Sequence, residues 1–226
     1  EQTSKDWNEL KSNDSWSIFK IMSEFVEGFD RMSKIGPCIS IFGSARTSPE
    51  NPYYSLGEEI AEKFASLGYG IITGGGPGLM EAANKGAQKA KGKSVGLNID
   101  LPFEQNHNPF IDQEHNLEFD YFFVRKVIFV KYSQAFVIMP GGFGTLDEFF
   151  EAMTLIQTKK ITKRPIVLVG TSYWIGLLKW VEETMLWKEK NISPDDLDLY
   201  KLVDTADEAV EYIEDFYRSH ALSPNF

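Results

Sequence analysis

Short apolar runs alternate with segments of helical spacing along most of the chain. Short apolar runs that end in turn residues are typical of buried strands. Six of them occur, at 38–42, 69–73, 94–99, 117–123, 135–139 and 165–169. The amphipathic segments between and after them predict helices at about 54–67, 79–90, 125–133, 145–157 and 205–216. Strands and helices that alternate in this way predict an α/β fold with a doubly wound parallel sheet.

The N-terminal part of the chain shows a different pattern. Residues 1–13 are polar and have no periodicity, which predicts a polar tail. From Asp14 onward, Phe19, Met22 and Phe29 recur at helical spacing, so we expect a helix whose apolar face packs on the core. Residues 14–226 are predicted to form a single domain, because sheets covered by helices on both faces often exceed about 200 residues.

Charge and cysteine content narrow the range of partners. The formal net charge of −10 disfavours binding to nucleic acid or to an anionic membrane, so any phosphate has to be bound by local groups. Cys38 is the only cysteine, which rules out a disulfide within the chain, and its place in an apolar run predicts a buried, inert thiol. The first residues have neither the basic nor the apolar stretch of an export signal. Together these features predict a cytoplasmic protein.

Two glycine-rich turns follow predicted strands, one at 74–78 and one at 140–145. In a doubly wound sheet, ligands bind beyond the carboxyl ends of the strands, where helix N-termini present free N–H groups. Glycine has no Cβ, so a phosphate can approach these N–H groups closely, and Thr145 adds a hydroxyl. One cluster of glycines can simply form a tight turn. Two clusters at equivalent positions favour a phosphate site.

The spacing of the glycines argues against two common nucleotide motifs. Gly74, Gly76 and Gly78 are spaced G-x-G-x-G and Leu79 follows, so the dinucleotide pattern G-x-G-x-x-G is not met. Residues 86–94 come close to the phosphate-loop pattern, but one residue too many separates the glycines and the segment precedes a strand. The three histidines lack the spacing of metal ligands. We therefore predict neither a metal nor a cofactor.

Charged residues lie near the same predicted sheet edge. Glu148 comes one turn into the helix after 140–145, where the helix dipole should hold its carboxylate ionised, as suits a base or a stabiliser of positive charge. Arg125 follows the fourth strand, where its guanidinium could bind phosphate or ribose oxygens, and Lys126 could do the same. Helix capping and simple exposure to solvent are the alternative interpretations of these residues.

Three segments together resemble the LOG (Lonely Guy) family, whose members are often labelled lysine decarboxylase-like. They are 72–81, the pair Arg125-Lys126, and 140–148, which reads P-G-G-x-G-T-x-x-E. The similarity runs from about Pro37 to the C-terminal helix. It implies that residues 14–226 form a Rossmann-like nucleotide-binding domain, assembled as a homodimer or from dimers. The long N-terminal segment is similar to the longer bacterial members.

The resemblance also implies an activity. Family members are phosphoribohydrolases, which hydrolyse the N-glycosidic bond of a nucleoside 5′-monophosphate, such as AMP or a cytokinin riboside monophosphate, to the free base and ribose 5-phosphate. By motif, Arg125 and Glu148 would be the catalytic pair. The implied phosphate and sugar ligands are Gly43, Ser44, Gly74, Gly75, Gly76, Gly78, Met80, Lys126, Pro140, Gly141, Gly142, Gly144, Thr145 and Asp147. An ionised Glu148 would stabilise the ribosyl cation and orient the attacking water.

A non-catalytic carrier and a pyridoxal enzyme are the alternative functions. A carrier that binds a nucleotide or cofactor without catalysis would need the same glycine turns but no carboxylate beside the ribose. A pyridoxal enzyme would need a lysine for the Schiff base, and none stands at a strand end facing both turns. Residues 101–116 predict a polar loop of a length often tied to function, and it could lie over the site.

Overall fold

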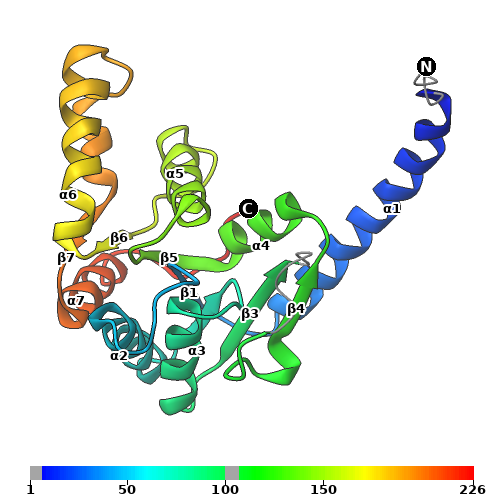
Figure 1. Ribbon diagram of the computed structural model, residues 1–226, viewed down its shortest axis with the longest axis horizontal. Coiled ribbons are helices and arrows are strands. Elements are labelled where there is room, and N and C mark those ends of the chain that lie inside the picture. Colours follow the sequence, from blue (N-terminus) through cyan, green and yellow to red (C-terminus); the bar gives the residue numbers. More distant parts are fainter. Residues whose placement is uncertain (1–6, 100–106) are drawn as a thin grey trace.

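The computed structural model describes residues 7–99 and 107–226, and these form one seven-stranded parallel sheet (Figure 1). The strands lie in the order β4-β3-β2-β1-β5-β6-β7. Their bounds are β1 (Cys38–Phe42), β2 (Gly70–Thr73), β3 (Ser94–Ile99), β4 (Asn116–Phe119), β5 (Ser133–Ile138), β6 (Ile166–Val169) and β7 (Lys201–Val203). The predicted fold class is confirmed. All six predicted strands are present, although the fourth ends four residues earlier than we expected.

Strand β7, which pairs with β6 at the edge of the sheet, was not predicted from the sequence. It contains only three residues and begins with the exposed Lys201. A strand this short offers too few positions for a pattern of apolar side chains to be recognised. Its last residue, Val203, is buried and belongs to the hydrophobic core that also contains Ile39 and Ile41.

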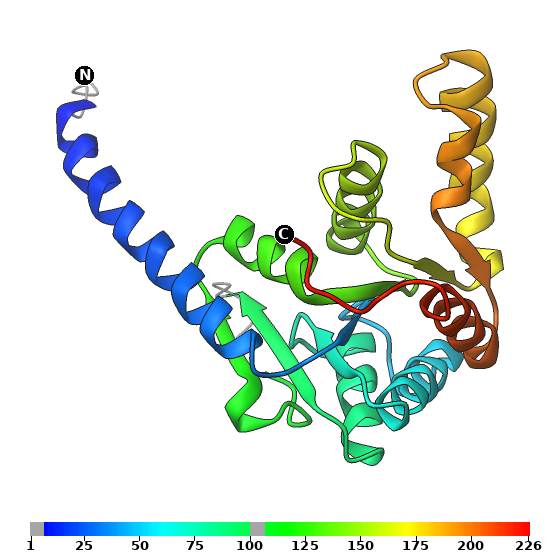
Figure 2. The same ribbon diagram turned by 180° about the vertical axis from the view of Figure 1, so that it is seen from behind.

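Helices cover both faces of the sheet, as Figure 1 and Figure 2 show from opposite sides. One face carries α2 (Pro52–Ser66), α3 (Leu79–Lys89) and α7 (Ala206–Tyr217). The other carries α4 (Phe122–Tyr132), α5 (Phe143–Gln157), α6 (Thr171–Trp180) and the end of α1 (Trp7–Met32). Short helical segments are η1 (Gln113–His115), η2 (Val181–Lys188) and η3 (Pro194–Leu199). Of the described helices, none is both long and apolar enough to cross a membrane.

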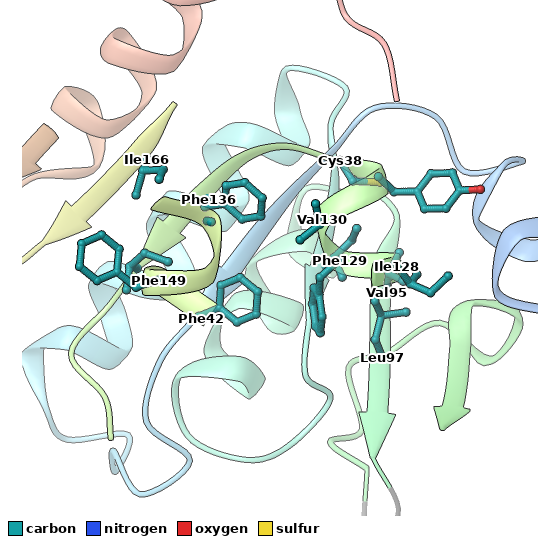
Figure 3. Close-up of a cluster of buried hydrophobic side chains, with 14 of the residues drawn as sticks. Cys38, Phe42, Val95, Leu97, Ile128, Phe129, Val130, Phe136, Phe149 and Ile166 are labelled. Carbon is teal, nitrogen blue, oxygen red and sulfur yellow. The ribbon is translucent and has the colours of Figure 1, made fainter. Parts of the chain in front are cut away.

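Two cores result, and the central strands contribute to both. Ile39 and Ile41 of β1 face α2 and α3, whereas Cys38 and Phe42 face the opposite core. Because successive side chains point to opposite faces, a central strand has to be apolar throughout. Figure 3 shows the second core, in which the rings of Phe42 and Phe129 lie 4.8 Å apart between their centroids. The thiol of Cys38 is buried as predicted, and burial raises its pKa to about 12, so it is inert at neutral pH.

The first helix differs from its prediction in two respects. It begins at Trp7 instead of Asp14, so part of the predicted tail 1–13 is helical, and residues 1–6 lie outside the described residues. Residues such as Glu9 and Lys11 favour a helix without apolar periodicity. Phe29 and Met32 pack against the core as predicted, whereas Phe19 and Met22, which we expected on the same packed face, are 63% and 55% exposed. The N-terminal part of the helix projects from the body of the molecule (Figure 1).

The direction of chain winding reverses between β1 and β5. From β1 the chain adds β2, β3 and β4 on one side, and β5, β6 and β7 lie on the other. At such a switch point, the loops after the two strands separate and leave a crevice at the carboxyl edge of the sheet. The glycine turns follow β2 and β5, and residues 43–46 follow β1. The topology therefore brings three turns to one place.

Candidate functional site

Ser44 joins the three turns at the switch point. Its backbone N–H donates to the carbonyl of Pro140 at 3.0 Å, and its own carbonyl accepts from the N–H of Leu79 at 3.0 Å. Gly78 has a φ of +69°, and a Cβ at this position would lie 2.4 Å from the Ser44 carbonyl oxygen, so only glycine fits. The two glycine turns are therefore neighbours on one rim of the sheet, as the phosphate argument required.

The first turn, 74–78, is held from behind by a network of buried polar side chains. Thr73 Oγ1 accepts from the N–H of Gly75 at 3.0 Å and donates to Asn84 Oδ1 at 2.6 Å. Asn108 Nδ2 donates to the carbonyls of Gly75 and Gly76 at 3.2 and 3.1 Å. This network was not predicted from the sequence, because Asn108 lies 33 residues from Gly75, and Asn84, on the helix after the turn, shows no local sign of its partners. Asn108 belongs to the predicted loop 101–116, of which 101–106 lie outside the described residues.

The second turn packs against the helix that it starts. A Cβ on Gly141 would lie 2.1 Å from Thr145 Oγ1, so the threonine side chain occupies the space beside the glycine. Gly142 is the N-cap of α5. Because glycine has no side chain, the first N–H groups of the helix stay accessible. Tyr173 of α6 donates its hydroxyl hydrogen to the Gly141 carbonyl at 2.5 Å. Helix start, threonine and tyrosine together fix this turn.

A cleft of about 1060 Å³ opens above the three turns. The predicted site residues that line it are Gly43, Ser44, Gly74, Gly75, Gly76, Met80, Arg125, Gly142, Gly144, Thr145, Asp147 and Glu148. Those that lie outside its lining are Gly78, Lys126, Pro140 and Gly141. Lining residues absent from the prediction are Phe42, Ala45, Arg46, Asn98, Ile99, His107, Glu118, Asp120, Phe122, Phe129 and Phe143. Among these, Asn98, Glu118 and Asp120 stand at or near the carboxyl ends of β3 and β4, a position that could have identified them.

Arg125 projects into the cleft from α4 between two aromatic rings. Its guanidinium carbon lies 4.7 Å from the centroid of Phe122 and 5.8 Å from that of Phe129. Within the described part of the chain, its buried Nε has no hydrogen-bond partner. Burial lowers the pKa of Arg125, while the charges of Glu148 and Asp147 act in the opposite direction. An arginine stays protonated nonetheless, so a permanent positive charge lines the cleft.

Glu148 faces the same cleft from α5 and is only 8% exposed. Burial raises its pKa to about 7, although the positive charges of Lys126 and Arg125 pull in the other direction. This corrects the prediction that the helix dipole holds the carboxylate ionised. Loss of hydration outweighs the attraction of both cations, because removing a charge from water costs more free energy than these neighbours return. Near pH 7 the group can therefore accept or release a proton.

Lys126 lies outside the cleft lining and pairs with acids of α5. Its Nζ lies 2.7 Å from Asp147 Oδ2 and 3.2 Å from Glu151 Oε2. Burial alone would lower the pKa of Lys126, but the hydrogen bond to Asp147 and the charges of Glu148 and Glu151 raise it. The lysine is therefore a fixed positive charge behind Glu148.

The lining carries little that would hold a cofactor or metal. None of the described residues that line the cleft is a lysine, so the chain offers no Schiff-base partner for pyridoxal there. Across 7–99 and 107–226, no group of three or more His, Cys, Asp or Glu side chains is arranged to hold a metal ion. The absence of metal and cofactor stays a prediction.

Most of the chain is similar to known proteins. A family described as possible lysine decarboxylase matches residues 80–213, more than half of the chain. An uncharacterized protein from Archaeoglobus fulgidus is 37% identical over 135 residues, 58% of this chain and 83% of the relative. The cytokinin riboside 5′-monophosphate phosphoribohydrolase LOG3 of Arabidopsis thaliana is 26% identical over 178 residues, 77% of this chain and 79% of the relative.

The fold recurs among solved structures. A molybdenum cofactor binding protein from the phototrophic bacterium Rippkaea orientalis superposes with a TM-score of 0.59 at 20% identity. The similarity covers 80% of this chain and 97% of that protein. At this identity the likeness concerns the fold alone.

Proposed function

We propose that this chain, which belongs to the LOG family, hydrolyses the N-glycosidic bond of a nucleoside 5′-monophosphate. The family model that it matches carries the description possible lysine decarboxylase. The products would be the free base and ribose 5-phosphate. One observation carries the proposal. A buried carboxyl with a pKa of about 7 and a guanidinium with an unused donor line a single cleft, together with two glycine turns.

The phosphate would be bound at the turns. Ser44, Gly75, Gly142 and Gly144 line the cleft beside the starts of α3 and α5, where the positive ends of the helix dipoles favour an anion. The two turns also contain residues outside the lining, which would hold the phosphate-binding backbone in place: Gly78, Pro140 and Gly141. Arg125 reaches the same region, since its Nη1 is 3.8 Å from the place of a Cβ on Gly74.

Glu148 would act on the sugar. As the C1′–N bond breaks, its electron pair leaves with the base and positive charge develops on the ribose ring. The ionised carboxylate stabilises that charge and takes a proton from the water that attacks C1′. The departing base receives the proton, so that atoms and charge balance. Arg125 fixes the substrate and aids the departing base.

Assembly, compartment and substrate choice belong to the same proposal. Phe143, Trp180 and Trp187 expose large aromatic surfaces, with Phe143 92% exposed, which supports a homodimer or a higher assembly of dimers. A single buried cysteine is consistent with a cytoplasmic protein. AMP and cytokinin riboside 5′-monophosphate are the substrates to test, the latter because it appears in the name of the plant relative.

Chromatography of reaction mixtures tests the activity. Purified protein with AMP should release adenine and ribose 5-phosphate, and Glu148→Gln and Arg125→Ala should abolish release while the fold persists. Glu59→Gln is the matched control, because this carboxylate lies on α2, pairs with Lys63 and is outside the cleft lining. Binding of AMP without release of base by the unmodified protein would instead identify a carrier. An aldimine absorbance band with pyridoxal phosphate would favour the decarboxylase description.

A further inference from the structure

One side chain of helix α6, that of Tyr173, contacts the second glycine turn. Tyr173 follows β6, and its hydroxyl donates to the carbonyl of Gly141, which follows β5. The tyrosine ring packs edge-on against Trp174, with centroids 4.8 Å apart and an interplanar angle of 84°. Trp174 is fully buried and donates from Nε1 to the carbonyl of Val169. The tyrosine ring thus rests against a residue of the core.

This hydrogen bond determines how the peptide group between Gly141 and Gly142 is oriented. In a trans peptide, the C=O of one residue and the N–H of the next point in opposite directions, and none of the described peptides is cis. The Gly141 carbonyl points to Tyr173, so the Gly142 N–H points away from it. Gly142 lines the cleft, whereas Gly141 and Tyr173 do not. The N–H is therefore directed at the cleft.

A peptide group between two glycines keeps a fixed orientation only if a contact such as this hydrogen bond holds it. Glycine permits a wide range of backbone angles, so the group could rotate and turn its N–H away from the cleft at little steric penalty. Thr145 Oγ1 restricts Gly141 at its Cα, but it makes no hydrogen bond to the Gly141 carbonyl. Among the described residues, Tyr173 is the hydrogen-bond donor to that carbonyl.

The first turn contains the same arrangement, built from different residues. Asn108 donates from its backbone N–H and from Nδ2 to the carbonyl of Gly75, at 2.9 and 3.2 Å. By the same peptide geometry, the N–H of Gly76 points in the opposite direction, and Gly76 lines the cleft. Two turns from different parts of the chain thus direct an N–H at one cleft by holding the preceding carbonyl.

We propose that Tyr173 is a positioning residue for anion binding: its hydroxyl holds the Gly141–Gly142 peptide so that the Gly142 N–H binds the phosphate of the nucleotide. The inference rests on the proposed function for the identity of the anion. Tyr173 touches no ligand and acts through the peptide. Its loss should weaken binding of the phosphate group and leave binding of the rest of the nucleotide unchanged.

Tyr173→Phe tests the proposal, because it keeps the ring on Trp174 and removes only the hydroxyl. Calorimetry would compare AMP, inorganic phosphate and adenosine, which lacks the phosphate. We expect the variant to bind AMP and inorganic phosphate about tenfold more weakly, as for a lost hydrogen bond to a charged group, with adenosine unchanged. The KM for AMP should rise by a similar factor, with a smaller effect on kcat.

The matched control is Tyr53→Phe. Its hydroxyl lies 3.4 Å from Ser172 Oγ, next to Tyr173 in the chain but without contact to the turn, and it should leave all three affinities unchanged. Equal phosphate affinity in Tyr173→Phe and the unmodified protein would overturn the inference. So would an equal loss for adenosine, or a failure of the unmodified protein to bind phosphate. If phosphate and AMP bind but no base is released, the proposed hydrolysis fails while this inference stands.

Discussion

The two glycine turns perform equivalent tasks at one cleft, but they are held in different ways. Behind the first turn lies a buried network in which Asn108 and Asn84 are 6% and 0% exposed. Behind the second stands Tyr173, which is 45% exposed, and the helix that carries Glu148. The side chains that hold the first turn are therefore buried in the interior of the protein. The second turn depends on a hydrogen bond that is exposed to water, next to the residue proposed to act on the sugar.

This difference suggests that stability and activity are divided between the turns. Buried polar groups are costly to leave unpaired, so changes behind the first turn should affect folding. Changes on the α5 side should affect chemistry and binding and leave folding largely intact. Four variants test this division.

The largest expected effect is on turnover, at the second turn. Glu148→Gln should lower kcat for AMP by about 10³-fold, within the usual range for loss of a proton-transfer and charge-stabilising group. Steady-state release of adenine measures it. Asn108→Ala, assayed under conditions in which it stays folded, should lose much less. Comparable losses of kcat in both variants would remove the proposed division.

The next effect is on folding, at the first turn. Asn108→Ala removes the donor to the Gly75 and Gly76 carbonyls and to Asn84 Oδ1, and should lower the free energy of unfolding by about 3 kcal/mol. Urea unfolding at pH 7 measures this change. Tyr173→Phe should lose about 1 kcal/mol or less, because water can replace its exposed bond. An equal loss in both variants would show that burial of the network does not matter.

A smaller effect links Glu148 to stability through pH. Its pKa is about 7 in the folded protein and 4.5 without burial, so between these values the folded state binds a proton that the unfolded chain has released. The unmodified protein should therefore lose stability as pH rises from 4.5 through 7. Glu148→Gln removes this loss and should be more stable at pH 8 by up to about 3 kcal/mol, with no such gain at pH 4. Thermal unfolding across that range measures both proteins, and parallel pH curves would contradict the buried carboxyl.

The smallest effect sharpens the role of Lys126. Its charge lowers the pKa of Glu148, so Lys126→Met should raise that pKa and move the increase of kcat/KM with pH to higher pH. A pH profile of AMP hydrolysis detects the shift. Lys85→Met is the control, because Lys85 pairs with Glu58 on α2, away from the cleft lining. An unchanged profile in Lys126→Met would mean that water screens this pair.

Local signals in the sequence predicted the sheet and the position of its turns. Apolar runs, glycine clusters and the order of elements depend on neighbouring residues, so strands β1 to β6 and the convergence of 74–78 with 140–145 could be predicted. The motif assigned Arg125 and Glu148 to one place, and both line the cleft. Their catalytic roles stay predictions.

Tertiary structure alone decided how those residues are held and charged. Asn108 lies 33 residues from its partner Gly75, and Tyr173 lies 32 residues from its partner Gly141. No local sequence pattern predicts these two contacts. The pKa of Glu148 likewise followed from burial, which is a property of everything packed around a carboxyl and not of its place in a helix. Sequence patterns report short-range geometry, whereas hydration and long-range hydrogen bonds exist only once the chain has folded.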